Sequence, residues 1–306
     1  MSHDFIAGIP LVLGGNVFGW SSKGDEALAV LDAFYEAGGR MIDTADVYSA
    51  WIPGHQGGES ESVLGEWLES RGVRNDMRIH TKTGMLGGAE LYEPARVLQS
   101  LDASLERLRT DRIDLYYAHK DYPELEIAQI VEAFDGAVRS GKVAAVGASN
   151  FDADRLSAAL AHAETGVARF EALQNEYNLA SRDAYGEQLQ QIVTASGMVM
   201  LPFFGLASGY LTGKYRNDDD YAKSTRGGRA KQLAGANGPR VLAAMDAVAA
   251  ETGASLSAIA LAWLVRQPGI PAPIASARTV AQLQELLEFT KVDLTDDQVA
   301  RLTAAA

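Results

Sequence analysis

Short apolar segments alternate with longer segments of helical periodicity along most of the chain. The apolar segments are rich in Val, Ile and Leu, which is typical of strands buried on both faces of a parallel sheet. We predict eight such strands, at residues 11–15, 40–44, 78–82, 113–119, 142–149, 170–175, 198–203 and 272–276. Helical periodicity predicts helices at residues 24–38, 59–72, 93–110, 126–141, 151–164, 184–197, 255–267 and 279–290.

Eight strand and helix units over about 250 residues predict an α/β fold, a (β/α)8 or TIM barrel. We expect a single domain that spans residues 1–306. The alternative is a doubly wound open sheet, which usually carries G-x-G-x-x-G after its first strand when it binds a dinucleotide. The chain contains no G-x-G at all, and this favours the barrel.

Composition narrows the classes of partner. With 47% hydrophobic and 22% charged residues in 306, the chain can bury a large core. Its 27 Lys and Arg against 40 Asp and Glu give a net charge of −13, and no basic block offsets it. A nucleic acid or an anionic membrane surface would be repelled by this charge. We therefore expect neither as a partner.

The absence of cysteine excludes disulfides and thiolate chemistry. The first ten residues lack the basic and apolar pattern of a signal peptide, and no apolar stretch reaches the roughly 18 residues that span a bilayer. These features predict a cytoplasmic protein without a membrane segment. The sequence leaves the oligomeric state open.

Reactive side chains stand where the predicted strands end. The segment RMIDTADVYSAW begins as the strand at 40–44 and then presents Asp43 and Tyr48; Lys82 and His119 end the third and fourth strands. Taken singly, the aspartate suits a helix cap, the tyrosine loop packing, the lysine a solvated charge and the histidine a structural residue. Their joint position at the rim where barrels place active sites favours catalysis. Asp46 has no such support, and we expect a solvated or turn residue.

Other reaction classes find no complete motif. GYLTGKY has three residues between its glycines where a P-loop needs four, and Tyr215 where Ser or Thr should bind magnesium. GASNF lacks the closing glycine of a serine hydrolase elbow. The five histidines are too far apart to form a recognised metal motif, so we expect no metal site.

Several short motifs, in order along nearly the whole chain, resemble the aldo-keto reductase family: DTADVY, the lysine that ends the next strand, YYAHKD, VGASNF, LQNEYN and GYLTGKY. The resemblance implies a barrel that binds NADP(H) across its C-terminal face. It also implies that Asp43, Tyr48, Lys82 and His119 form the catalytic tetrad.

The resemblance further implies the residues that hold the cofactor. Ser149, Asn150 and Gln174 would bind the nicotinamide carboxamide, and the ring of Phe203 would stack on the nicotinamide. Contacts along the pyrophosphate and the adenosine end are implied for Leu206, Ser208, Lys214, Arg278 and Gln282. Of these, Arg278 would meet the 2′-phosphate and Gln282 the adenine. The family often has Asn where this chain has Leu286, which implies one missing contact to adenine.

The implied activity is reversible reduction of an aldehyde or ketone by NADPH, with Tyr48 as the proton donor. Lys82 would lower the pKa of the phenol, Asp43 would keep the lysine protonated, and His119 would orient the carbonyl oxygen. NAD(H) use remains the alternative cofactor preference. A redox-sensing regulatory subunit that binds the cofactor with little turnover remains the alternative function.

The substrate is a small carbonyl compound or alcohol whose identity the sequence leaves open. Loops at the rim offer Trp20, Trp51, His55 and Tyr122 as pocket residues, which suit a sugar, an aromatic aldehyde or a ketosteroid. The segment 214–240 has little hydrophobic periodicity. It predicts a mobile flap over the cofactor, with a solvated linker as the alternative.

Overall fold

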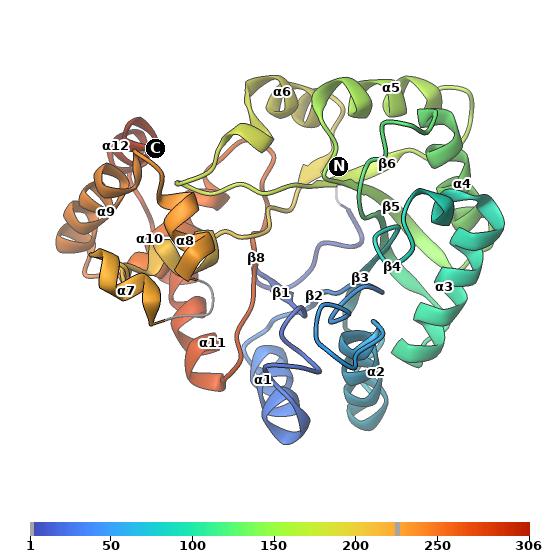
Figure 1. Ribbon diagram of the computed structural model, residues 1–306, viewed down its shortest axis with the longest axis horizontal. Coiled ribbons are helices and arrows are strands. Elements are labelled where there is room, and N and C mark those ends of the chain that lie inside the picture. The colour runs from blue at the N-terminus through green and yellow to red at the C-terminus, as the bar shows by residue number, and fades with distance from the viewer. Residues whose placement is uncertain (1–2, 224–226) are drawn as a thin grey trace.

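The computed structural model describes residues 3–223 and 227–306 (Figure 1). Its strands are β1 (Val12–Gly14), β2 (Met41–Asp43), β3 (Arg78–Thr83), β4 (Ile113–Ala118), β5 (Val143–Ser149), β6 (Phe170–Gln174), β7 (Val199–Met200) and β8 (Ile274–Ala275). All eight predicted strands are present, and β7 and β8 are shorter than predicted.

The strands form one parallel sheet in the order β7-β6-β5-β4-β3-β2-β1-β8. Each strand from β1 to β6 pairs with the next in sequence, and β8 pairs with β1. The two ends of the sheet meet through a backbone hydrogen bond of 2.8 Å from Ile274 N to Pro202 O, just after β7. The sheet therefore closes, and the predicted (β/α)8 barrel is confirmed.

Eight helices match the predicted ones: α1 (Gly24–Glu36), α2 (Glu59–Arg71), α3 (Pro94–Leu108), α4 (Ile127–Arg139), α5 (Ala153–Ala163), α6 (Glu187–Ala195), α10 (Leu256–Val265) and α11 (Val280–Leu287). Four short 3-10 helices supplement them: η1 (Ala89–Tyr92), η2 (Asp183–Tyr185), η3 (Ala207–Thr212) and η4 (Glu288–Lys291). Four further α-helices were not predicted: α7 (Asp218–Ala222), α8 (Gly227–Ala234), α9 (Gly238–Thr252) and α12 (Asp296–Ala305).

The segment 214–240 differs from the solvated linker that was its alternative expectation, and the flap over the cofactor stays a prediction. It contains α7 and α8 and enters α9, and these helices gather beside α10 and α12 at one side of the barrel (Figure 1). Ala230 and Leu233 of α8 are buried, so this part of the segment is packed, not a solvated linker. The expected flap also includes residues 224–226, which lie outside the described residues.

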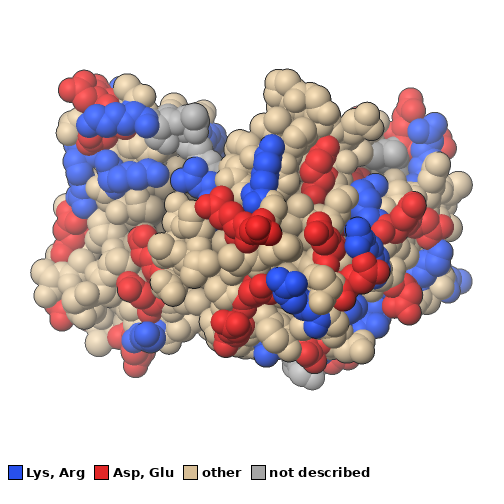
Figure 2. Space-filling model, turned by 90° about the horizontal axis from the view of Figure 1, so that it is seen from below, with Lys and Arg blue, Asp and Glu red and all other residues tan. Residues whose placement is uncertain are grey.

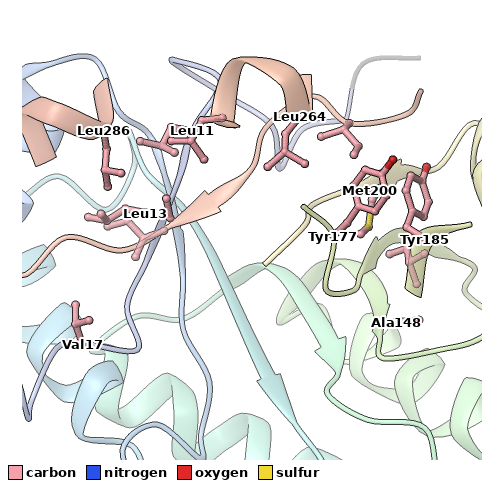
Figure 3. Packing of buried hydrophobic residues seen from close by; sticks show 14 of the residues in the cluster. Leu11, Leu13, Val17, Ala148, Tyr177, Tyr185, Met200, Leu264 and Leu286 are labelled. Atoms are coloured by element: carbon pink, nitrogen blue, oxygen red, sulfur yellow. The ribbon is translucent and has the colours of Figure 1, made fainter. Parts of the chain in front are cut away.

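The core has two compartments, as a barrel requires. Inward-facing side chains fill the barrel, among them Val12, Leu115 and Ala172. The larger cluster lies between the strands and the surrounding helices, where Leu11, Leu264 and Leu286 come from distant parts of the chain (Figure 3). This packing fixes the strand ends, and the loops that follow them carry the candidate site.

No single helix among the described residues is long and apolar enough to cross a bilayer. Only α9 and α10 reach that composition together, as a pair bent by 97°.

Candidate active site

Lys82 joins the candidate residues of two neighbouring strands. Its Nζ donates to Asp43 Oδ2 at 2.6 Å, to Thr44 O at 2.7 Å and to the Tyr48 hydroxyl at 3.1 Å. The residue is fully buried and Asp43 is 2% exposed. Because β2 and β3 are parallel neighbours, their carboxyl ends bring the two side chains to the same edge of the barrel. All three hydrogens of the ammonium are thereby used.

Burial and charge oppose each other in setting the state of Lys82. Burial alone would lower the pKa of this ammonium, but the charge of Asp43 and the hydrogen bonds to Asp43 and Tyr48 raise it above its ordinary value. Lys82 is therefore a cation in the folded protein.

Tyr48 departs from the expected direction of its pKa. Burial raises the pKa of the phenol above its ordinary value, and the positive charge of Lys82 opposes this rise without cancelling it. The phenol is therefore protonated at neutral pH, which suits a proton donor. Lys82 limits how far the pKa of the phenol rises.

His119 follows β4 directly, and its backbone N–H donates to Thr83 O at 2.9 Å. The centroid of its ring lies 6.0 Å from that of Tyr48. Burial, together with the charge of Lys82, lowers the pKa of His119 well below its ordinary value. A neutral imidazole beside the phenol can donate a hydrogen bond to a substrate oxygen. The structure thus brings all four predicted catalytic residues together.

Gln174 adds a link that the sequence reading missed. Its Nε2 donates to Asp43 Oδ1 at 2.8 Å, while the other carboxylate oxygen accepts from Lys82. Both oxygens of the buried carboxylate are therefore paired. The two residues are 131 positions apart, and the pairing follows from their inward-facing places at the ends of β2 and β6.

Apolar side chains surround the mouth of this site. The ring of Trp51 lies edge-on to Tyr48, with centroids 5.8 Å apart, and Trp20 lies edge-on to Trp51 at 6.2 Å. The large hydrophobic residues that are exposed in the described chain all stand in βα loops at this end of the barrel: Trp51, Met85, Leu86 and Phe204. We call these four residues the apolar collar. The pair MetLeu between glycines at 84–88 is the signal that could have indicated part of it.

The other two predicted pocket residues make contacts of their own. His55 Nδ1 lies 3.9 Å from Glu59 Oε1. The hydroxyl of Tyr122 donates to Gly84 O at 2.6 Å, and its ring packs edge-on against Tyr92. The structure brings Trp51 to Tyr48 and Trp20 to Trp51, and it shows no contact with Tyr48 for His55 or Tyr122 within the described residues.

Comparison with known proteins shows the family to which the chain belongs. The model of the Aldo/keto reductase family matches residues 10–306. The chain belongs to the aldo/keto reductase family.

Relatives of this aldo/keto reductase include named oxidoreductases. The chain is 30% identical over 294 residues to "Aldo-keto reductase str7" of Strobilurus tenacellus, covering 94% of this chain and 83% of that one. It is 32% identical to "Norsolorinic acid reductase B" of Aspergillus parasiticus, covering 93% and 75%. It is 31% identical to "Aryl-alcohol dehydrogenase [NADP(+)]" of Phanerodontia chrysosporium, covering 92% and 76%.

Members of the aldo/keto reductase family generally use a nicotinamide cofactor, and the rim next to the tetrad has groups that fit one. Ser149 ends β5, and Asn150 follows it in the left-handed conformation with φ of 59°. The Asn150 amide donates to His119 O at 2.9 Å, which fixes the side chain beside this histidine. Phe203 lies beyond β7, with its ring 5.2 Å from that of Phe204.

Next to Phe203, the backbone forms a tight left-handed turn. Ala207, Ser208 and Gly209 in η3 have positive φ values of 49°, 56° and 90°. The backbone N–H groups of Ala207 and Gly209 donate to Phe204 O at 2.7 Å and to Leu206 O at 2.8 Å, so the turn is held by its own hydrogen bonds. Leu206 is the residue before this turn. A side chain at Gly209 would meet Lys214 Nζ at 2.9 Å, so the ammonium lies against the turn.

The predicted adenosine residues lie at the start of α11. Arg278 is exposed and has no ion pair within the described residues, and its backbone N–H donates to Gln282 Oε1 at 2.9 Å. Leu286 is 5% exposed and belongs to the hydrophobic core, so its side chain is directed into the protein. Leu286, which stands where the family often has Asn, is therefore a packing residue of the core.

The structure corrects the expectation that Asp46 could be solvated. Asp46 lies in a turn, as one of the two expectations had it, but it is 3% exposed and accepts a hydrogen bond of 2.7 Å from Thr83 Oγ1, so it is not solvated. The sequence reading missed it because the two residues that cover it, Glu61 and Arg107, lie on α2 and α3.

A metal centre and a surface hollow are the other candidates for a site among the described residues. No group of three or more His, Asp or Glu side chains there is placed to hold a metal ion. A hollow of about 980 Å³ is lined by the loop at 179–187, by α8 and by the residues before α9, away from the tetrad. The chemistry of the tetrad is the better guide to the active site.

Proposed function

We propose that this aldo/keto reductase catalyses the reversible NADPH-dependent reduction of an aldehyde or ketone, with Tyr48 as the proton donor. The observation that carries the proposal is the buried chain of contacts from Asp43 through Lys82 to the Tyr48 hydroxyl, with distances of 2.6 and 3.1 Å. A solvated lysine and a tyrosine that only packs a loop would not be expected to form this hydrogen bond around a fully buried ammonium.

Each residue has a definite task in this mechanism. The bound nicotinamide supplies the hydride that reduces the carbonyl carbon. Tyr48 gives its proton to the developing alkoxide, and Lys82 stabilises the phenolate that remains. The neutral His119 imidazole holds the carbonyl oxygen in reach of the phenol. Asp43 compensates the charge of the buried ammonium throughout.

The cofactor preference rests on Arg278. An exposed guanidinium without an ion pair in the described chain can bind a 2′-phosphate in two-point fashion, and NADH lacks that phosphate. Ser149, Asn150 and Gln174 would bind the carboxamide, while Leu206, Ser208, Lys214 and Gln282 would follow the rest of the cofactor. One relative is named for NADP(+). We infer a preference for NADPH, because the adenosine end offers one clear cation.

The substrate is best explained as a neutral carbonyl compound with an aromatic ring. The apolar collar of Trp51, Met85, Leu86 and Phe204 exposes apolar surface that a flat ring can cover. Trp51 lies directly beside the catalytic phenol. Two relatives carry aromatic compounds in their names, an aryl alcohol and norsolorinic acid.

A matched panel of aldehydes tests the proposal. We expect NADPH-dependent reduction, with kcat/KM at least about 10-fold higher for an aryl aldehyde than for an aliphatic aldehyde of equal carbon number or an aldose. Trp51→Ala should lower kcat/KM for the aryl aldehyde and leave the aliphatic one little changed. Equal values for all three substrates would refute the aromatic preference, and no reduction of any would refute the activity.

A further inference from the structure

Asp46 is a buried acid next to the catalytic groups that the mechanism above does not use. Its Oδ2 accepts from Thr83 Oγ1 at 2.7 Å, and its Oδ1 is buried without a hydrogen-bond partner among the described residues. Its backbone N–H donates to Lys82 O at 3.1 Å. The residue therefore ties the loop that carries Tyr48 to the strand that carries Lys82.

A second carboxyl close by, Glu61, binds the guanidinium that lies nearest to Asp46 among the described residues. Arg107 donates from Nε to Glu61 Oε2 at 2.7 Å, and Thr81 Oγ1 donates to Glu61 Oε1 at 2.6 Å. Both oxygens of Glu61 are thus paired. The guanidinium of Arg107 acts on Asp46 only through its charge, with no ion pair between them in the described chain.

Phenols form the rest of the surroundings. The titratable groups that face Asp46 from the neighbouring loops and strand, apart from Glu61 and Arg107, are Tyr48, Tyr92, Tyr116 and Tyr122. Three of these hydroxyls already bond elsewhere: to Lys82, to Lys120 O and to Gly84 O. An ionised Asp46 would therefore be a buried charge with a hydrogen bond from the Thr83 hydroxyl, the backbone N–H of Val47 beside it and no ion pair among the described residues.

The neutral acid fits this environment better than the carboxylate. Burial is the main cause that raises the pKa of Asp46 to about 7, with the charge of Glu61 adding to the rise and Thr83 and Arg107 opposing it. The other displaced groups at the site move out of the neutral range, since the pKa values of Tyr48 and Lys82 rise and that of His119 falls.

We propose that Asp46 is a positioning residue that serves the reductase as a neutral carboxylic acid, and that its ionisation above neutral pH lowers the rate of carbonyl reduction. The proposal rests on the proposed function. A negative charge at Asp46 opposes the phenolate that Tyr48 must become, and it disfavours the packed position of the loop that holds the phenol.

The pH dependence of reduction separates this role from a structural one. We would measure the rate at saturating NADPH and aldehyde for the wild type and Asp46→Asn, whose amide imitates the neutral acid. The wild-type rate should fall about 10-fold between about pH 6 and pH 8, the range set by one ionisation near neutrality. The Asn variant should change less than about twofold over the same range.

Asp102→Asn is the matched control, because that carboxylate is 59% exposed and pairs with Lys142 on the surface. Its pH profile should equal that of the wild type. The proposal is overturned if Asp46→Asn keeps the wild-type profile, or if it loses the same factor at every pH.

A titration independent of turnover keeps the two proposals apart. In protein labelled with carbon-13 at the aspartate carboxyl, one signal should titrate near pH 7 and be missing in Asp46→Asn. A signal for Asp46 that titrates below about pH 5 would contradict the neutral acid, whatever the activity. Failure of every carbonyl substrate with a normal titration would instead refute the proposed function.

Discussion

At the scale of single residues, hydrogen-bond partners decide which buried groups are charged. Lys82 and Asp46 are neighbours through the backbone and both are buried. The lysine has three acceptors, one of them a carboxylate, and it remains a cation. The aspartic acid has one hydroxyl donor and no ion pair in the described chain, and its pKa rises to about 7. The same burial thus supports opposite charge states.

The cofactor preference can be tested at one residue. Arg278→Ala removes the cation at the start of α11 while leaving the helix intact, since its Thr279 cap bonds to Gln282 N. We expect affinity for NADPH to fall about 10-fold to 100-fold, the scale of a charge-assisted pair, and affinity for NADH to stay nearly constant. Fluorescence titration gives both dissociation constants. An unchanged ratio between the two cofactors would show that the 2′-phosphate lies elsewhere.

The residues at the ends of strands were the predictable part of the site. Asp43, Tyr48, Lys82 and His119 follow from the rule that a barrel gathers its strand ends at one rim. The state of Asp46 was not predictable, because it depends on burial in the fold and on the charges of Glu61 in α2 and Arg107 in α3, which the sequence does not place beside it. The Gln174 link to Asp43 likewise depends on the curvature that brings β6 opposite β2.

At the scale of elements, α2 and α3 hold the loop of Tyr48 in place by packing very closely. Gly65 is the contact point: a Cβ there would lie 2.1 Å from the carbonyl oxygen of Arg107. Glu61, one turn earlier on α2, binds the side chain of the same arginine at 2.7 Å. A side chain at position 65 would push apart the two helices that enclose Asp46.

Gly65→Ala should therefore destabilise the protein by about 1–3 kcal/mol, the usual cost of overpacking. Gly136→Ala on α4 is the matched control, because nothing lies within 4 Å of a Cβ there. In that helix interior the alanine should stabilise by about 0.5–1 kcal/mol. Denaturant unfolding of both variants measures the difference. Equal stabilities of the two variants would refute the close packing of α2 on α3.

Helices were predictable where one face is clearly apolar, and less so elsewhere. The segment 214–240 reads as polar, but α8 buries Ala230 and Leu233 against the helices beside the barrel. α9 is also absent from the predicted helices, although Val241, Leu242, Met245 and Val248 are buried on one side. No strand directly precedes α9, so it stands outside the alternation of strands and helices on which the prediction is based.

At the scale of the whole molecule, acidic and basic side chains are interspersed on the face seen in Figure 2, although the net charge is −13. Ion pairs at the surface of the described chain include Arg71 with Asp32 and Arg301 with Glu251. Exposed pairs of this kind contribute little to stability. The pH dependence of stability near neutrality should therefore reflect buried groups more than the surface.

Asp46 should contribute to that dependence. Its folded-state pKa of about 7 lies above its ordinary 3.8, so the stability it contributes is present at acid pH and is lost as the pH rises through 7. Full ionisation costs up to about 4 kcal/mol. Asp46→Asn should thus gain stability over the wild type as the pH is raised from about 4 to about 8. Melting temperatures across this range check it; a constant difference would refute it.

The central claim is that Tyr48 and Lys82 form one proton-transfer unit, and single-turnover reduction of an aldehyde at saturating NADPH tests it most directly. Tyr48→Phe and Lys82→Met should each slow the reduction by about 100-fold or more, while fluorescence titration shows NADPH still bound. The double variant should be scarcely slower than the slower single one, because both changes disable the same step. Near-normal reduction by folded, NADPH-bound Tyr48→Phe, or additive losses in the double variant, would contradict the account.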